Sequence, residues 1–578
     1  MKIIFRNIRG KEYIYLALTA LLVALQVRLD LLFPEYLRTI TALLQVPEAV
    51  VFEMILPSCL KMLAVALAGL ACGVCTAFCI TRMSTLIVAR IREQTFNKVI
   101  DLSQKEIGEF TIPSLLSRCN FDIQQVRSFI ILLPQVVVRA PMTGIIAAVK
   151  LSTSNFTWTA IVLAVLVITI CFIVLLVRSL TSKMNVVNRL TDKLNRVSME
   201  HITGLRVIHS YNAYGHQQKR FEDVNHPLTD MNIDVNSRMA MMYPVLTFMQ
   251  SIGGVLIYLS GAYMIEAMEG PARQLLFSDM IVAYYYSGTV MISFMMVAIA
   301  MIQLPRMILS TKRINEVLDS PVSIEDGEGD VPEKTGTVEF RHVNFRYPQA
   351  AENALEDISF KAERGQTVAF IGSTGCGKTS IMNLIPRIYD VTGGEILVDG
   401  LDVREFRLHD LRERIGYVPQ KNTLFKGTIS ENIAYGDEER SEEEIRKAAG
   451  VGQADEFIAG RPGGYDAVVE HGGGNFSGGQ KQRLAIARAV CKDPEIYLFD
   501  DSFSALDLVT DRKVRENLRR NSNGATILIA AQRISTIIDA DKILVIDRGR
   551  VIAEGRHREL METCGLYQEI AKSQMGQD

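Results

Sequence analysis

The sequence lacks an excess of charge of either sign. Its 62 Lys and Arg residues nearly balance 64 Asp and Glu residues, which leaves a net charge of −2 over 578 residues. Without an overall basic field, we expect no nucleic-acid partner. Nor do the nine cysteines have the spacing of a disulfide framework. Cys72, Cys75 and Cys79 are close together, but they lie in an apolar run where small residues pack helices, so we expect packing rather than a metal site.

We also expect that the first apolar stretch is not a cleaved signal peptide. No small-residue cleavage site precedes Arg28, although residues 13–27 are apolar. The sequence instead separates apolar residues, which make up 48% of the total, from the 22% that are charged. The apolar residues gather into long stretches in the first half of the chain, and the second half is polar. This division indicates a membrane-embedded part followed by a soluble part.

Six stretches are apolar enough to cross a bilayer, whose core needs about 20 helical residues. Four of them reach this length without a charged residue: residues 62–81, 156–177, 239–265 and 280–305. The fifth, residues 13–27, is short and is followed by Arg28 and Asp30, and the sixth, residues 128–149, contains Arg139. Charges at membrane depth are costly, so we expect these three to pair with one another or to meet a polar group of a substrate.

Lys and Arg are concentrated in the loops on one side of these spans. The N-terminal segment and segments 82–127 and 178–238 are rich in them, whereas loops 45–53, 150–155 and 266–279 contain at most one each. By the positive-inside rule the basic side is cytoplasmic. We therefore expect a multi-pass protein of the plasma (inner) membrane, with its N-terminus and its polar half in the cytoplasm.

Both long basic segments contain helical apolar spacing, at residues 91–102 and 186–198. This spacing, and the absence of low-complexity sequence, favour rigid helical stalks over solvated linkers. At 1.5 Å per residue, a 20-residue limb reaches about 30 Å from the membrane.

The polar half contains a strand, a glycine-rich loop and a helix in an order that binds phosphate. Residues 367–371 are β-branched and apolar, and a helix is expected from Ser380. The P-loop motif between them consists of Gly372, Ser373, Thr374, Gly375, Cys376, Gly377, Lys378 and Thr379. Its glycines let backbone N–H groups turn toward phosphate oxygens. We expect Lys378 to reach the β- and γ-phosphates of ATP, and Thr379 to hold Mg²⁺.

A second buried strand, residues 496–499, ends in Asp500, where a carboxylate can hold Mg²⁺ through water. From about residue 337, strands alternate with helices, which predicts a largely parallel sheet. The expected fold is therefore an α-helical transmembrane bundle of six spans with long cytoplasmic stalks, fused to an α/β P-loop nucleotide-binding domain. We assign residues 1–324 to the bundle, 325–336 to an acidic linker and 337–578 to the nucleotide-binding domain.

The hexapeptide Asn-Phe-Ser-Gly-Gly-Gln at 475–480, followed by Lys-Gln-Arg-Leu-Ala-Ile-Ala-Arg, resembles the signature motif of ATP-binding cassette (ABC) proteins. Tyr-Val-Pro-Gln at 417–420 and Ser-Ala-Leu-Asp at 504–507 are similar to two further motifs of that family. With its six spans and stalks, the whole chain resembles a half-transporter of the multidrug and lipid exporter type. The resemblance implies ATP-driven export, with each ATP sandwiched between two chains.

The resemblance also implies roles for individual residues. Tyr347 would stack on adenine rather than serve only as a half-exposed strand tyrosine. Gln420 would sense Mg²⁺ and the attacking water, and Asp507 would lie at the seam between two cassettes. The P-loop, through Ser380, would hold the phosphates. The signature residues that would cap the γ-phosphate of the partner's ATP are Ser477, Gly478, Gly479 and Gln480.

Two positions depart from the family pattern. Asp501 stands where the family usually has the glutamate that positions the attacking water, and its carboxylate is one methylene shorter. Gln532 stands where the family usually has a histidine, and glutamine carries neither a proton nor a positive charge at neutral pH. All eight histidines are at other positions. A positioned general base contributes typically about 10²–10⁴-fold to a rate, so we expect a slow, degenerate site.

The sequence therefore predicts one subunit of a heterodimeric exporter of amphipathic drugs or lipids. Its own pocket would turn ATP over slowly, and its intact signature would complete a competent site on the partner. A homodimer with two slow sites and an ATP-gated regulatory membrane protein are the alternatives. Residues 284–286, three consecutive tyrosines, and the methionines of 291–301 either line a substrate cavity or pack helices.

Overall fold

The computed structural model describes residue 4 and residues 6–45, 52–437 and 439–575, so part of the loop at 45–53 lies outside the described residues. The chain divides into two compact units, Met1–Ile100 with Thr111–Ser320 and Asp101–Phe110 with Pro321–Asp578. Six helical segments of the described part are long and apolar enough to cross a membrane. Each contains one of the six predicted stretches, which confirms the expected spans.

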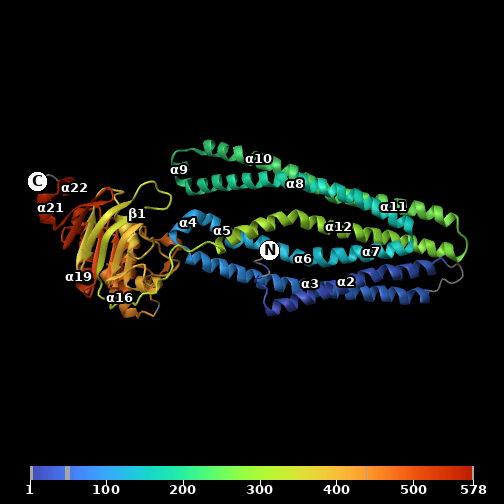
Figure 1. Cartoon of the computed structure of the whole chain (residues 1–578), viewed down its shortest axis with the longest axis horizontal. Coiled ribbons are helices and arrows are strands. Elements are labelled where there is room, and N and C mark those ends of the chain that lie inside the picture. The colour runs from blue at the N-terminus through green and yellow to red at the C-terminus, as the bar shows by residue number, and fades with distance from the viewer. Residues whose placement is uncertain (1–3, 5, 46–51, 438, 576–578) are drawn as a thin grey trace. The chain divides into compact units, whose positions relative to one another are not determined.

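Helices make up all the regular structure described in the first unit (Figure 1). They are α2 (Gly10–Leu43), α3 (Phe52–Asp101), α5 (Ile112–Ser117), α6 (Ile123–Pro134), α7 (Ala140–Ser154), α8 (Phe156–Thr203), α9 (Leu205–Ser210), α10 (Tyr214–Ala240), α11 (Met242–Glu266) and α12 (Pro271–Leu318), with π-helical turns η1 (Arg118–Asp122) and η2 (Gln135–Arg139).

The predicted stalks are continuations of membrane helices. α3 has 50 residues and α8 has 48. At 1.5 Å per residue each is more than about 70 Å long, over twice the thickness of a bilayer core. The helical spacing at 91–102 and 186–198 lies at the far ends of these two helices. α8 and α10 run side by side as a hairpin, with α9 at its tip (Figure 1).

The third span is not one regular helix. η2 widens the backbone between Pro134 and Pro141, which lack the N–H groups that an α-helical ladder needs. Arg139 lies at the end of this wide turn, and its Nη2 is 3.2 Å from Oδ2 of Asp30 on α2. The pairing of these two charges, one of the alternatives left open by the sequence, is therefore present.

Close packing of α11 against α12 depends on glycine. A Cβ on Gly254 would lie 2.5 Å from the Tyr284 ring, and one on Gly261 would lie 2.4 Å from the Met280 sulfur. Tyr286 is buried in the bundle core, whereas Tyr285 borders a cavity. The three consecutive tyrosines thus divide between helix packing and cavity lining.

The second unit contains two main sheets and a two-stranded one. The six-stranded sheet has the order β12 (Arg550–Gly555), β11 (Lys542–Asp547), β3 (Thr367–Ile371), β10 (Thr526–Ala530), β9 (Ile496–Asp500), β6 (Ile415–Val418). The four-stranded sheet has the order β2 (Leu355–Ala362), β1 (Val338–Phe345), β4 (Gly393–Val398), β5 (Leu401–Asp402), and β7 (Gly427–Thr428) pairs with β8 (Val468–Val469). Only β12 runs antiparallel in the six-stranded sheet, so the largely parallel sheet is confirmed.

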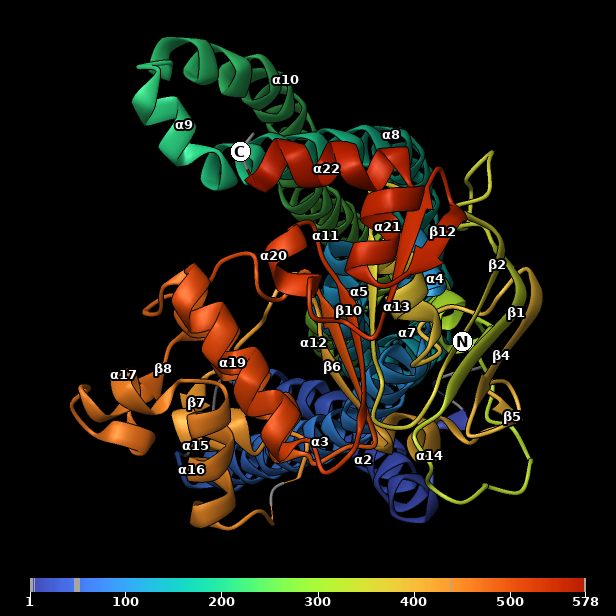
Figure 2. The same ribbon diagram turned by 90° about the vertical axis from the view of Figure 1, so that its left-hand side faces the viewer.

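The two large sheets pack face to face. The ring of Phe360 on β2 stacks on Phe340 at 4.5 Å and meets Phe370 of β3 edge-on at 5.1 Å. In each of the strands β3, β9 and β10, all five residues are buried, as expected for central parallel strands that are covered on both faces. Figure 2 shows the antiparallel strands on one side of these central strands and a helical group, α15 to α17, on the other.

The helices of the second unit connect and cover these strands. They are α4 (Gln104–Phe110), α13 (Lys378–Leu384), α14 (Leu408–Glu413), α15 (Ile429–Ile433), α16 (Glu442–Val451), α17 (Asp455–Ala459), α18 (Gly478–Cys491), α19 (Leu508–Asn521), α20 (Ile534–Ile537), α21 (His557–Thr563) and α22 (Gly565–Met575). The segment before β1 lies along this unit, where Gly327 N–H donates to Phe406 O at 2.9 Å. Arg414 also holds it, donating to Pro332 O at 2.5 Å while pairing with the buried carboxylate of Asp399.

Candidate functional site

The polar residues predicted to bind nucleotide follow neighbouring strands of the six-stranded sheet. The P-loop follows β3, Gln532 follows β10, Asp500 ends β9, and Gln420 follows β6. These four strands are adjacent in the order β3-β10-β9-β6 and are parallel, so their carboxyl ends meet at one edge. Such an edge is where open α/β sheets bind ligands.

The P-loop has the backbone that its sequence predicts. Gly375 has φ +84° and Gly377 has φ +110°, which is the region that glycine adopts without strain. A Cβ on Gly377 would lie 2.6 Å from Leu355 Cδ2, so a side chain would also collide with the neighbouring strand. The Lys378 ammonium lies over this loop and donates to Gly372 O at 2.8 Å and to Ser373 O at 3.0 Å. A cation held by two carbonyls of a loop whose tip, including Gly375, is exposed is well placed to meet a phosphate.

Thr379 and Asp500 bring two hard oxygen ligands together. Thr379 Oγ1 donates to Asp500 Oδ1 at 3.0 Å, across from the P-loop to the end of β9. Asp500 is only 3% exposed, and burial raises the pKa of its carboxyl above the usual range. Oxygen atoms of this kind are the ligands that Mg²⁺ prefers, and a divalent cation would compensate a buried carboxylate.

Because burial disfavours the ionised form and raises the pKa of the Asp500 carboxyl, we expect this carboxylate to destabilise the protein when neither metal nor nucleotide is bound. Asp500→Asn keeps the acceptor for Thr379 and is expected to raise the melting temperature at neutral pH. As pH falls through the raised pKa, the native protein takes up a proton and the penalty on the wild type disappears. The difference between the two proteins should therefore shrink on acidification in Mg²⁺-free thermal unfolding. Asp539→Asn, at a mostly exposed carboxylate, should give a smaller difference at neutral pH.

Asp501 is held by both glutamines that the sequence singled out. Its Oδ2 accepts from Gln532 Nε2 at 3.1 Å and from Gln420 Nε2 at 3.5 Å. Burial raises the pKa of its carboxyl as well. The residue has φ +49°, an uncommon conformation outside glycine that is typical of functional turns. The three predicted catalytic residues are thus in contact, because Gln420 and Gln532 both donate to Oδ2 of Asp501.

Tyr347 lies beside the P-loop helix. Its hydroxyl is 2.9 Å from Ser380 Oγ, and its ring meets Phe345 edge-on at 4.7 Å and Tyr389 edge-on at 5.4 Å. The ring is half-buried and braced by two aromatic neighbours. Such a fixed ring suits stacking on a base.

Ser477 begins α18 with a capping box. Its Oγ accepts from Gln480 N at 3.3 Å, and Gln480 Oε1 accepts from Ser477 N at 3.1 Å. The next residue, Gly478, faces open space, because a Cβ there would meet no atom within 4 Å. Gly479 is more confined, because a Cβ there would lie 3.1 Å from the backbone oxygen of Ala505. The first helical turn of α18 is therefore accessible, and its N–H groups carry the partial positive charge of a helix N-terminus.

Asp507 has a structural role in this chain. Its Oδ1 accepts from Val509 N at 3.1 Å and Thr510 N at 3.0 Å, which makes it the N-cap of α19. The same backbone hydrogen bonds, foremost that from Thr510, lower the pKa of its carboxyl. Its expected place at the seam with a second cassette stays a prediction.

Gln482 is a residue that the sequence motifs did not single out. It is buried in α18, donating to the backbone oxygen of Asp501 at 3.3 Å and accepting from Ala505 N at 3.2 Å. One amide therefore joins the signature helix to the turn that carries Asp501. The available signal was a polar residue on the buried face of an amphipathic helix.

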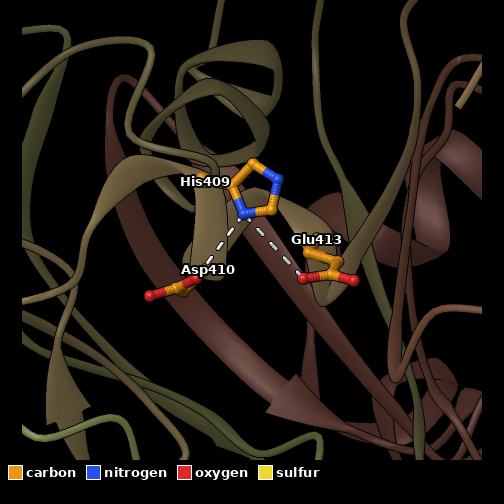
Figure 3. A group of neighbouring side chains, drawn as sticks. All are labelled: His409, Asp410 and Glu413. Carbon is orange, nitrogen blue, oxygen red and sulfur yellow. Dashed lines mark hydrogen bonds and ion pairs between the residues drawn. The ribbon is translucent and has the colours of Figure 1, made fainter.

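Among the described residues, one group of three could hold a metal ion outside this edge. His409, Asp410 and Glu413 lie on the short exposed helix α14, with the His409 Nδ1 3.5 Å from Asp410 Oδ1 and 4.0 Å from Glu413 Oε2 (Figure 3). His409 is 85% exposed, and the two contacts are those expected of neighbours on one helical turn. We assign no function to this group.

A bundle of six apolar helices joined to a P-loop domain with an accessible signature helix defines an ATP-dependent membrane transporter. Comparison with known proteins agrees. The profile of the ABC transporter transmembrane region matches residues 16–307, and that of the ABC transporter matches residues 355–504. The chain belongs to the ABC transporter family. It is an integral membrane protein that binds ATP and couples ATP hydrolysis to transport.

Several relatives are similar over most of their length. An uncharacterized ABC transporter ATP-binding protein of Mycobacterium tuberculosis is 36% identical over 496 residues, covering 84% of this chain and 83% of that protein. An ATP-dependent lipid A-core flippase of Pseudomonas aeruginosa is 31% identical over 494 residues, covering 85% and 81%. The structure of a bacterial Atm1-family ABC exporter with ATP bound superposes with a TM-score of 0.84 at 23% identity, covering 97% and 99% of the two chains, which shows a shared fold.

Proposed function

We propose that this chain is one subunit of a heterodimeric exporter of amphipathic small molecules, either drugs or lipids. Its own ATP site is slow, and its signature motif completes the fast site of a second half-transporter. In this proposal residues 1–324 form the membrane domain, 325–336 the linker and 337–578 the cassette. The names of the flippase and exporter relatives support export as the direction of transport.

The observation that carries this proposal is the environment of Asp501. Its carboxylate is one methylene shorter than the family's glutamate, and Oδ2 accepts from two amide groups, at 3.1 Å from Gln532 and 3.5 Å from Gln420. Neither amide can take up or release a proton near neutral pH. A misplacement of about 1 Å costs about 100-fold in rate, so a pocket of this composition holds ATP but hydrolyses it slowly.

The signature end of the same cassette supports the second half of the proposal. Ser477 and Gln480 fix the start of α18, and Gly478 leaves its first turn open. N–H groups at this turn suit the γ-phosphate of an ATP held by another P-loop. A chain with an intact signature turn and a shortened carboxylate at Asp501 is suited to an asymmetric pair.

A second polypeptide is also supported by the exposed tip of the α8–α10 hairpin. Large apolar side chains are exposed there, foremost Tyr211 at 81% and Ile202 at 72%, with Val207 at 60%. Soluble surfaces rarely gather such residues unless a partner covers them. Membrane lipids cannot cover this tip if the hairpin is a cytoplasmic stalk, as the distribution of Lys and Arg favours.

Mg²⁺ is part of the proposal. Thr379 and Asp500 would hold the ion, with Gln420 completing its surroundings once nucleotide is present, and Lys378 would meet the β- and γ-phosphates. Tyr347 would stack on adenine. The bound ion would supply charge neutralisation between the phosphates, and Asp501 with Gln532 would orient the water. The protein would lie in the plasma (inner) membrane with its cassette in the cytoplasm.

The test is a pair of substitutions in the purified two-subunit transporter. Asp501→Asn in this chain should change the total ATPase rate by less than about twofold, because the general base of the fast site belongs to the partner. Replacing the partner's corresponding glutamate with glutamine should lower the rate at least about 100-fold. Loss of most activity on Asp501→Asn would refute the degenerate site, and full activity of a complex made only of this chain would favour a homodimer.

A further inference from the structure

A cavity of about 480 Å³ lies in the membrane-spanning unit between α2 and α3, next to α12. Most of its lining is apolar, including Leu29 and Leu70, but Gln26, Asp30 and Tyr285 add an amide, a carboxylate and a phenol. The volume is within the range of sites that bind small molecules, about 300–1,000 Å³. A few polar groups in an apolar wall are also typical of such sites.

Two glycines on α3 face the polar groups of α2 at close range. Gly69 and Gly73 are four residues apart, so they lie on the same face of the helix. A Cβ on Gly69 would be 3.8 Å from Asp30 Oδ1, and one on Gly73 would be 3.4 Å from Gln26 Nε2. Both polar atoms therefore point toward α3 at positions where α3 has no side chain.

Asp30 is only partly neutralised. Within the described part of the chain, its one bonded partner is Arg139, whose Nη2 reaches Oδ2 at 3.2 Å, and Oδ1 accepts no hydrogen bond. Gln26 likewise makes no hydrogen bond among the described residues. A charge in a membrane helix is expensive and is typical of a functional site. Two other pairs on α2, Glu35 with Lys150 and Arg38 with Asp279, do not border the cavity.

An aromatic wall stands beside the carboxylate. Phe33, one turn from Asp30 on α2, stacks on Tyr285 of α12 with ring centroids 6.0 Å apart. Both rings line the cavity. Aromatic faces attract cations, and the attraction is larger where water is excluded.

We propose that this cavity binds an organic cation that has an N–H donor and an apolar, aromatic body. The donor meets Asp30 Oδ1 and the body lies on the Phe33–Tyr285 wall, above Gly69 and Gly73. The inference rests on the proposed export function, whose substrate class it names. The same chemistry is found in free aromatic amines and in the ammonium headgroup of an aminolipid.

The test measures equilibrium binding of ethidium, an aromatic cation with two amino groups, to the full-length transporter in phosphatidylcholine nanodiscs without nucleotide. Asp30→Asn should raise the ethidium Kd about tenfold or more, because it removes the negative charge while keeping the shape of the side chain. Gly69→Leu should raise it similarly by filling the cavity without changing any charge. Arg139→Gln should lower it because the carboxylate loses its competing partner. Uncharged phenanthridine should not displace ethidium.

Glu35→Gln is the matched control, since it removes a paired carboxylate of the same helix that lies outside the cavity. It should leave the ethidium Kd unchanged. An unchanged Kd in both Asp30→Asn and Gly69→Leu overturns the proposal. If phosphatidylethanolamine in the nanodisc competes with ethidium in the wild type but not in Asp30→Asn, the ligand is a lipid headgroup; without competition it is a free cation. Because no nucleotide is present, the result is independent of the ATPase asymmetry tested above.

Discussion

Gly478→Asp in this chain should lower the ATPase rate of the two-subunit transporter by at least about 100-fold. The new carboxylate would lie at the first turn of α18, against the γ-phosphate that this turn is proposed to cap. Removing a single donor from such an anion site typically costs about 10²–10³ in rate, and adding a negative charge should cost no less. The measurement is steady-state ATP hydrolysis by the purified pair.

The substitution should not disturb folding. A Cβ at position 478 meets no atom within 4 Å, and an aspartate in the first turn stabilises a helix. Gly565→Asp is the matched control, because Gly565 is also an open glycine at the start of a helix, α22, in the same unit. It should leave the rate unchanged. Retention of more than half the activity by Gly478→Asp would contradict the proposal that this turn caps the γ-phosphate of the partner's ATP.

The combined substitution Asp501→Glu with Gln532→His should accelerate ATP turnover in this chain's own pocket by about 100-fold. Glutamate would extend the carboxylate by one methylene toward the attacking water, and histidine would provide a group that can carry a proton. Turnover is best measured in a pair whose partner glutamate has been replaced, so that only this pocket contributes.

Each single substitution serves as a control for the double one. Asp501→Glu alone should give a smaller gain, because Gln532 would still donate an amide hydrogen bond to the carboxylate. If the double variant is no faster than the wild type, the slow turnover has another origin than these two residues. ATP affinity should change little in any of these variants, since Lys378 and Thr379 are untouched.

The sequence predicted the membrane helices and the site motifs for definite physical reasons. Long apolar runs can only be buried in a bilayer or a core, so all six spans were identifiable, although one run is short and another contains Arg139. The wide turn before Arg139 was not, because two prolines indicate a break without fixing its geometry. The antiparallel sheet that carries Phe340 and Phe360 was also missed, since an alternating pattern in short strands is weaker than a continuous apolar run.

Within the site, each motif indicated its own residues but not their contacts. That Gln420 and Gln532 both donate to one oxygen of Asp501 depends on the strand order β10-β9-β6, which brings together residues more than 30 positions apart. The role of Gln482 could not be predicted from the sequence. It depends on hydrogen bonds to the backbone of Asp501 and Ala505, which no local sequence pattern reveals.

The Gln482 amide has a mechanical consequence. If ATP binding or product release moves the turn at Asp501, the movement must either break this buried hydrogen bond or pull α18 along with it. Because Ser477 is the N-cap of α18, such a pull would displace the first turn of this helix, which is proposed to face the ATP held by the partner's P-loop. In the proposed asymmetric pair, this amide would couple events in the chain's own ATP site to the site that Ser477 completes on the partner.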